Sequence, residues 1–144
     1  MNPFTFTIPG KPIGKERART VRQNGAIRTY TPEKTAVYQQ LVQWTYKGAG
    51  GPHYGKNPVA ITIRAFFPIP KNTKKSERQD MLDDIVKPTV TPDADNIQKV
   101  ICDALNGIAY EDDKQVVSSS VIKMYAQHPC VNVEIEDAEY GNSP

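Results

Sequence analysis

The chain is poor in the residues that build disulfide frameworks and zinc sites. Only two of its 144 residues are cysteines and two are histidines. Cys102 and Cys130 lack metal-ligand or redox spacing, and one bridge would be weak evidence for a secreted scaffold, so we expect free thiols. His53 and His128 stand alone in the sequence, which leaves a zinc site short of ligands. Any metal is therefore expected on oxygen ligands.

Long apolar runs are also missing. No stretch reaches the roughly 18 to 20 consecutive apolar residues of a membrane span, and Met1–Gly10 has neither the basic nor the apolar region of a signal peptide. We therefore expect a cytoplasmic protein with no membrane partner. A length of 144 residues, 38% of them hydrophobic, predicts one domain over residues 1–144, with a frayed tail over 138–144.

The net charge of +2 hides a separation of charge along the chain. Between residues 10 and 34 there are seven basic and two acidic residues, whereas residues 93–113 hold six acids and one lysine. Basic surfaces attract phosphates, while a carboxylate cluster repels them unless cations sit in it, so the pattern favours a metal-dependent enzyme acting on a polyanion. A solvated face is the alternative for each charged run. The residues predicted to bind DNA are Lys11, Lys15, Arg17, Arg19, Arg22, Lys71, Lys74 and Lys75.

Periodicity and capping residues predict an α+β fold with a mixed β-sheet and two main helices. The expected strands are Pro3–Ile8, Ala26–Tyr30, Val59–Phe67 and a final hairpin of Gln115–Ala126 with Cys130–Asp137. The expected helices are Pro32–Lys47 and Asp93–Asn106, with Lys71–Asp80 as a polar connection and a helical turn or two within Gln79–Val86.

Each main helix has an expected cap and an expected buried face. The first is predicted to use Thr31 as N-cap and to bury Val37, Tyr38, Leu41 and Trp44. The second is predicted to use Asp93 as N-cap and to bury the apolar residues between Ile97 and Ile108. Asp95 and Lys99 then lie one turn apart, opposite the buried face.

A glycine-rich segment, residues 50–57, copies the phosphate-binding pattern G-x-x-x-x-G-K-[ST] except at Asn57, which has no hydroxyl for magnesium. The segment follows a predicted helix and leads into a strand, the reverse of a phosphate-binding loop. Pro52 also removes a backbone donor. We therefore expect a flexible loop and no nucleotide cofactor.

The acidic residues from 93 to 113 are the most informative group. Asp93 and Asp95 flank a predicted helix start, and Glu111, Asp112 and Asp113 follow that helix, so carboxylates from both places can form a site for a hard cation such as Mg²⁺. An ordinary N-cap with exposed acids is the alternative. Pro92-Asp93 with Asp112-Asp113-Lys114 also loosely copies the PD…(D/E)xK pattern of restriction-type nucleases, in which Lys114 would be the catalytic lysine.

Three blocks in this region resemble the signature of the RusA-type Holliday junction resolvases of phages and prophages. They are Asp93-Ala94-Asp95-Asn96 with Lys99, then Asp103-Ala104-Leu105 ending at Gly107, then Asp112-Asp113-Lys114-Gln115-Val116. The blocks occur in the family's order, and the opening strand and the final hairpin extend the likeness over most of the chain. The resemblance implies a magnesium-dependent endonuclease, with Mn²⁺ as a substitute, that acts as a homodimer on four-way DNA junctions.

The resemblance also implies roles for single residues. Asp93, Asp95 and Asp113 match the family's catalytic, metal-binding carboxylates, and Lys99 matches its essential lysine. Asp103 and Asp112 are expected to support these ligands. The arginine-rich run that some members carry before the D-x-D-N block is replaced here by residues 86–91. A nuclease for other branched DNA and a DNA-binding protein without catalysis are the alternatives.

Overall fold

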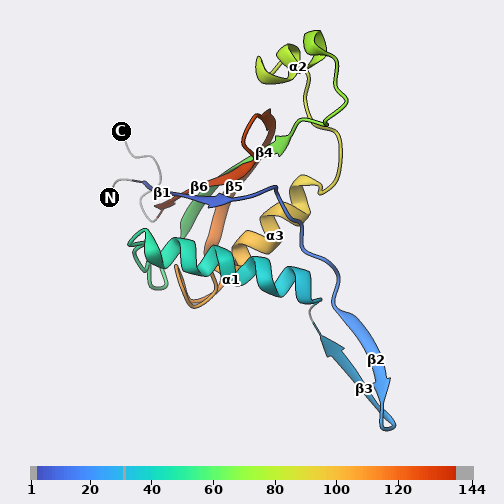
Figure 1. Ribbon diagram of the computed structural model, residues 1–144. Coiled ribbons are helices and arrows are strands. Elements are labelled where there is room, and N and C mark those ends of the chain that lie inside the picture. Colours follow the sequence, from blue (N-terminus) through green and yellow to red (C-terminus); the bar gives the residue numbers. More distant parts are fainter. Residues whose placement is uncertain (1–2, 31, 139–144) are drawn as a thin grey trace.

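A four-stranded mixed sheet with two helices on one face forms the body of the protein (Figure 1). The computed structural model describes residues 3–30 and 32–138. Across the sheet the strands are β1 (Phe4–Pro9), β6 (Cys130–Asp137), β4 (Val59–Pro68) and β5 (Val116–Ala126). The packed helices are α1 (Glu33–Gly48) and α3 (Ala94–Ala104). The predicted α+β fold with a mixed sheet is therefore confirmed.

The expected hairpin between β5 and β6 does not form. Strand β4 lies between them, antiparallel to β6 and parallel to β5. Inward residues of β4 alternate with partly exposed ones along its whole length, so this most apolar strand takes the centre of the sheet. The three residues 127–129 cross the end of β4, because strands two positions apart are only about 10 Å from one another.

The buried face of α1 agrees only in part with the one predicted: Tyr38 is buried and Leu41 packs partly buried against the core, as expected, but Val37 and Trp44 are not buried. Val37 and Trp44 are 58% and 69% exposed, whereas Tyr38, Val42 and Tyr46 are buried. Tyr46 points inward because its hydroxyl donates a hydrogen bond to the Pro52 carbonyl and its ring packs edge-on against two phenylalanines of β1. The helix begins after Pro32, and the predicted cap Thr31 lies outside the described residues.

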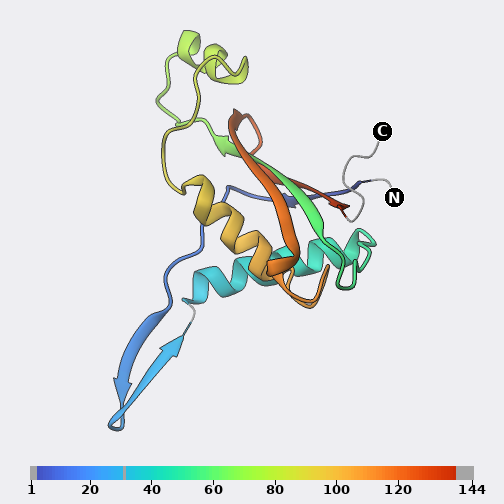
Figure 2. The same ribbon diagram turned by 180° about the vertical axis from the view of Figure 1, so that it is seen from behind.

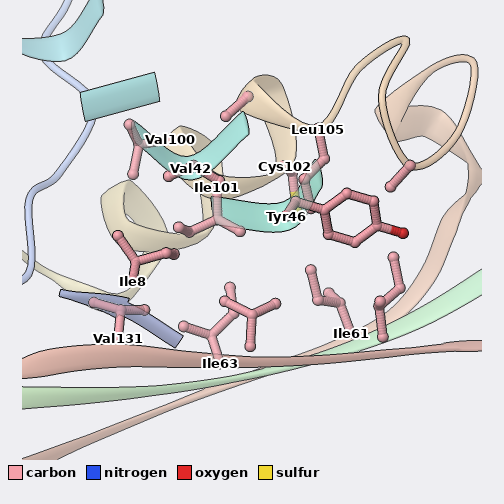
Figure 3. Packing of buried hydrophobic residues seen from close by; sticks show 14 of the residues in the cluster. Ile8, Val42, Tyr46, Ile61, Ile63, Val100, Ile101, Cys102, Leu105 and Val131 are labelled. Carbon is pink, nitrogen blue, oxygen red and sulfur yellow. The ribbon is translucent and has the colours of Figure 1, made fainter. Parts of the chain in front are cut away.

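Helix α3 confirms its prediction. Asp93 is the N-cap, and the apolar residues between Ile97 and Leu105 are buried. Figure 3 shows Val100, Ile101 and Leu105 facing Ile61 and Ile63 across the core. The N-cap fixes where this helix begins, and its one-sided apolar pattern packs it against the sheet. The opposite face of α3 is therefore free for polar residues.

Two projections leave the body at opposite ends (Figures 1 and 2). One is a hairpin of β2 (Arg19–Gln23) and β3 (Ala26–Tyr30), of which the sequence predicted only β3. The other carries α2 (Lys75–Leu82), a third helix where a polar connection was expected. No residue of α2 is buried. Within residues 3–30 and 32–138 no helix is long and apolar enough to cross a membrane.

Candidate active site

The first turn of α3 presents two carboxylates and a lysine. Asp93 Oδ1 accepts a hydrogen bond of 2.8 Å from the backbone N–H of Asn96, which fixes its side chain over the helix start. Asp95 Oδ2 lies 3.0 Å from Lys99 Nζ, one turn further on. Both side chains of this pair are largely exposed. The sequence-based placement of Asp95 and Lys99 as exposed neighbours is confirmed.

A second acidic group lies beyond the other end of α3, in the turn that leads into β5. Asp112 caps the short 3-10 helix Asp113–Gln115 by accepting 2.9 Å from the N–H of Lys114. The side-chain oxygen Oε1 of Gln115 accepts from the N–H groups of Glu111 and Asp112, each at 2.9 Å. This capping arrangement holds the acidic turn in one conformation.

Gln115 also anchors the acidic turn to the glycine-rich loop. Its amide nitrogen donates to the carbonyl oxygens of Gly55 and Asn57, at 2.8 and 2.9 Å. Gln115 was not among the residues predicted to form the site. The spacing of Asp112 and Gln115, the pattern of a capping box, is the signal that indicates it. The loop at residues 50–57 therefore supports the acidic turn and leads into β4.

The acidic turn brings Asp113 against other carboxyl groups. Burial, together with the adjacent carboxylates of Asp103 and Asp112, raises the pKa of Asp113 to about 6. The Asp112 pKa is lowered instead, because the Lys114 N–H donates to its carboxylate. The Lys15 amine contacts Asp103 Oδ2. Asp103, Asp112 and Asp113 thus form one group, with Lys15 beside it.

The two acidic groups are separated within one chain. Asp95 and Asp103 are eight residues apart on α3, which corresponds to about 12 Å along the helix axis. Asp113 lies with Asp103 and not with Asp95. Among residues 3–30 and 32–138, no group of three or more His, Cys, Asp or Glu side chains is placed to hold a metal ion. Asp93, Asp95 and Asp113 do not converge in a single protomer.

A cleft of about 480 Å³ opens beside Asp93. Its basic lining consists of Lys11, Lys15 and Lys34, so two residues predicted to bind phosphate adjoin the start of α3. The segment that carries them crosses α3 closely: the Lys15 N–H donates 3.0 Å to the Asn96 carbonyl. The carboxylates of Asp93 and Glu16 therefore share this cleft with three lysines.

The remaining residues predicted to bind DNA lie on the two projections. Arg17 leads into β2, and Arg19 and Arg22 are exposed within it. Lys71, Lys74 and Lys75 are exposed on the projection that carries α2. Both views show α3 between the two projections (Figures 1 and 2). The basic groups thus flank the helix that carries Asp93 and Asp95.

The sequence of the chain matches a known protein family along most of its length. The profile described as endodeoxyribonuclease RusA matches residues 9–136, nearly the whole chain. The chain belongs to the RusA endodeoxyribonuclease family. The match spans both acidic groups, the cleft and both projections. The resemblance drawn from the three sequence blocks is therefore confirmed.

One relative is similar in sequence along most of both chains. The uncharacterized protein YqaN of Bacillus subtilis (strain 168) is 31% identical over 139 residues, which covers 95% of this chain and 98% of that protein.

The donor chemistry in this RusA-family chain suits a hard divalent cation. The candidate ligands are all carboxylate oxygens, which Mg²⁺ prefers. The crowding that raises the Asp113 pKa is relieved when a cation neutralises the carboxylates. Lys99, held by Asp95, supplies a positive charge suited to a phosphate oxygen. The carboxylates therefore suit a divalent cation, although a single chain places them in two separate groups.

Proposed function

We propose that this protein is a magnesium-dependent endonuclease that resolves four-way DNA junctions by hydrolysing phosphodiester bonds in two strands. The observation that carries the proposal is the match to the RusA family, supported by carboxylates at the start of α3 and on the turn before β5, between two projections that carry basic residues. Carboxylates of this kind in a basic surface suit a polyanionic substrate only with cations present.

Asp93, Asp95 and Asp113 would hold Mg²⁺, and Mn²⁺ is expected to replace it. The bound ion supplies Lewis-acid stabilisation of the scissile phosphate and a more acidic water. Lys99 contacts a phosphate oxygen and is oriented by Asp95. Asp103 and Asp112 position Asp113 through their adjacent carboxyl groups. Lys11 would bind a neighbouring phosphate in the cleft beside Asp93, and Lys15 would do so on leaving its contact with Asp103.

A homodimer paired through β5 would bring the separated carboxylates together. Asp113 immediately precedes β5, and Lys123, near the end of that strand, donates 2.6 Å to the Val90 carbonyl just before Asp93. The two acidic groups therefore lie toward opposite ends of β5. When two such strands pair antiparallel about a two-fold axis, the start of one strand lies beside the end of the other. Asp113 of one protomer would then approach Asp93 and Asp95 of its partner.

The free edge of β5 has the character of a pairing surface. It is an edge strand of the sheet, and residues 117–120 are exposed. Residues 116–122, Val-Val-Ser-Ser-Ser-Val-Ile, are nearly palindromic about Ser119 and carry no charge. Such an uncharged edge lacks the usual protection against pairing with another strand. Antiparallel self-pairing centred on Ser119 would place Val117 opposite Val121 and serine opposite serine.

Dimer symmetry also matches the substrate. A four-way junction has two equivalent strands to cut, and a two-fold symmetric enzyme presents two equivalent sites. The choice between a four-way junction and another branched DNA depends on the spacing of these sites, which single charged residues do not encode.

Cleavage of a substrate panel tests the proposed function. The purified protein is incubated with a four-way junction, a flap, a three-way branch and a plain duplex, each with Mg²⁺, with Mn²⁺ or with EDTA. We expect paired, symmetric cuts in the junction with either metal, and none with EDTA. Preferential cutting of flaps would assign the activity to other branched DNA. Binding without cleavage of any substrate would leave a DNA-binding protein.

A further inference from the structure

The β2–β3 hairpin stands apart from the core and has nothing buried in it. Every residue of both five-residue strands is exposed. Val21, Ile27 and Tyr30 are 39%, 68% and 45% exposed, so apolar side chains face solvent on this hairpin. A two-stranded hairpin alone is marginally stable in water. A surface that covers it on binding is therefore expected.

A tight turn defines the two faces of the hairpin. Asn24 and Gly25 have φ values of 53° and 77°, both in the left-handed region that a two-residue type I′ turn requires. The resulting register pairs Val21 with Arg28 and Arg22 with Ile27. Because opposed residues share a face, one guanidinium stands beside one apolar side chain on each face.

All charged residues of the hairpin segment are arginines. Residues 17–32 contain four arginines, no lysine and no acid. The α2 projection differs, because Lys71, Lys74 and Lys75 are mixed there with acidic residues. Arginine binds planar, paired acceptors through two parallel hydrogen bonds, whereas lysine acts as a point charge on phosphate. The hairpin therefore suits a polyanion that also carries pairs of hydrogen-bond acceptors lying in one plane.

We infer that the β2–β3 hairpin enters the major groove of a duplex arm of the DNA, an inference that rests on the proposed junction-cleaving function. A two-stranded ribbon fits the major groove, which is about 12 Å wide and about 8.5 Å deep. Five residues of strand extend about 16 Å, so the tip reaches the groove floor while the base of the hairpin remains at the phosphates. Duplex DNA supplies both the charge and the acceptor edges that the arginines require.

The position of each residue along the hairpin gives it a different contact. Arg22 and Arg28 lie in the second and third residue pairs from the turn and meet base edges. Arg19 lies opposite Tyr30 at the base of the hairpin and meets the backbone. Val21 and Ile27 pack against base edges or thymine methyl groups in the groove. The hairpin thus binds the arm beside the branch point and leaves the carboxylates of α3 free for cleavage.

Blocking the major groove tests this inference. Binding is measured by fluorescence anisotropy, without divalent metal, to two junctions of one sequence, one with plain cytosine and one with glucosylated 5-hydroxymethylcytosine in its arms. We expect the wild-type protein to lose about tenfold or more in affinity on the glucosylated junction, comparable to losing one guanidinium–base pair. The Arg22→Ala/Arg28→Ala variant should bind both junctions equally well.

Three comparisons make the result decisive. Lys74→Ala/Lys75→Ala, on the α2 projection, should keep the wild-type sensitivity to glucosylation. Arg22→Lys/Arg28→Lys should keep the salt dependence of binding but show less sensitivity to glucosylation, because lysine retains only the point charge. Circular dichroism should show an unchanged fold for each variant, because these side chains are exposed.

The inference is overturned when wild-type binding is insensitive to glucosylation or when the Arg22→Ala/Arg28→Ala variant remains as sensitive as wild type. It is also overturned when that variant loses a dimer that the wild-type protein forms, because the hairpin would then cover a second copy of the chain. The proposed function fails separately, when the unmodified junction is bound through the hairpin but is not cut with Mg²⁺.

Discussion

At the scale of single residues, Asp113 has the most unusual environment among the proposed ligands. Its carboxyl group is partly buried beside Asp103 and Asp112, and its pKa is raised to about 6. Asp93 instead accepts a backbone N–H, and Asp95 pairs with Lys99. The three proposed ligands are thus held by three different interactions, and each can be tested by its own substitution.

The carboxylate substitutions Asp93→Asn, Asp95→Asn and Asp113→Asn should each lower magnesium-dependent junction cleavage by about 100-fold or more, the cost of losing metal-assisted stabilisation. Junction binding without metal should persist or become tighter, because a negative charge is removed near phosphate. Single-turnover cleavage and anisotropy measure the two effects. Glu111→Gln is the matched control, because Glu111 is exposed on the same turn. Near wild-type cleavage by any one of the three variants removes that residue from the site.

The two candidate lysines can be separated in the same assay. Lys99→Ala should slow cleavage by about 100- to 1,000-fold, the effect of losing one transition-state donor. Lys114→Ala should have little effect, because Lys114 contributes its backbone N–H to Asp112 and the substitution keeps that group. The reverse ranking would support the restriction-type arrangement with Lys114 as the catalytic lysine.

At the scale of elements, α1 shows that a helix with apolar residues on more than one side is positioned by its neighbours. Val37 and Val42 lie on the same helix, one 58% exposed and the other fully buried. The sheet presents Phe4 and Phe6 to Tyr46, and these ring contacts select the buried face.

The matched pair Val42→Ala and Val37→Ala tests which face of α1 is buried. Val42→Ala should lower the free energy of unfolding by about 2 kcal/mol, from lost burial and the cavity left behind. Val37→Ala should change it by less than about 0.5 kcal/mol, as an exposed substitution. Urea denaturation of both variants measures the difference. Equal destabilisation would mean that Val37 is also covered in solution.

The crossing of the N-terminal segment over α3 depends on Gly14. A Cβ at this position would lie 2.7 Å from Pro92 Cβ and 3.1 Å from Asn96 Cβ, too close for either rigid neighbour. Gly14→Ala should therefore destabilise the fold by about 1 to 3 kcal/mol and lower junction affinity, because Lys11 and Lys15 are displaced. Gly48→Ala is the control, since nothing lies within 4 Å of its Cβ position. Thermal melting with both variants checks this, and a Gly14→Ala protein as stable as Gly48→Ala would contradict the close crossing.

At the scale of the whole molecule, the sheet has two free edges of different character. β1 forms one edge and β5 the other. The β5 edge carries the uncharged, nearly palindromic run centred on Ser119. The acidic turn comes directly before this run in the chain. A complete carboxylate site in this proposal therefore requires two chains.

Ser119→Lys should convert the proposed dimer to a monomer, because the two-fold axis of β5 pairing would set the two lysines against each other. Cleavage should fall with the loss of the dimer, while the monomer keeps its fold, since Ser119 is exposed. Multi-angle light scattering measures the mass. Thr5→Lys, on the opposite edge strand, is the control and should remain dimeric. A Ser119→Lys protein that remains dimeric would place the interface elsewhere.

The sequence alone determined the features that depend on local chemistry. The cap at Asp93, the buried side of α3 and the exposed pair of Asp95 and Lys99 follow from residues within a few positions of one another. The strand Ala26–Tyr30 also follows from local pattern. Short-range hydrogen bonds and a one-sided apolar pattern strongly favour one conformation for such elements, which is why they could be predicted from the sequence. The structure confirms these predictions.

Features that depend on residues distant in the sequence became visible only in the three-dimensional packing. β4 lies between β5 and β6, because a strand that buries alternate residues along its length is most stable at the centre of the sheet. The buried face of α1 was selected by aromatic rings of β1, distant in sequence. The separation of Asp113 from Asp95 arose from the length of α3 and the direction of β5. Sequence spacing identified these carboxylates, but the packing of helix on sheet decided which of them meet within one chain.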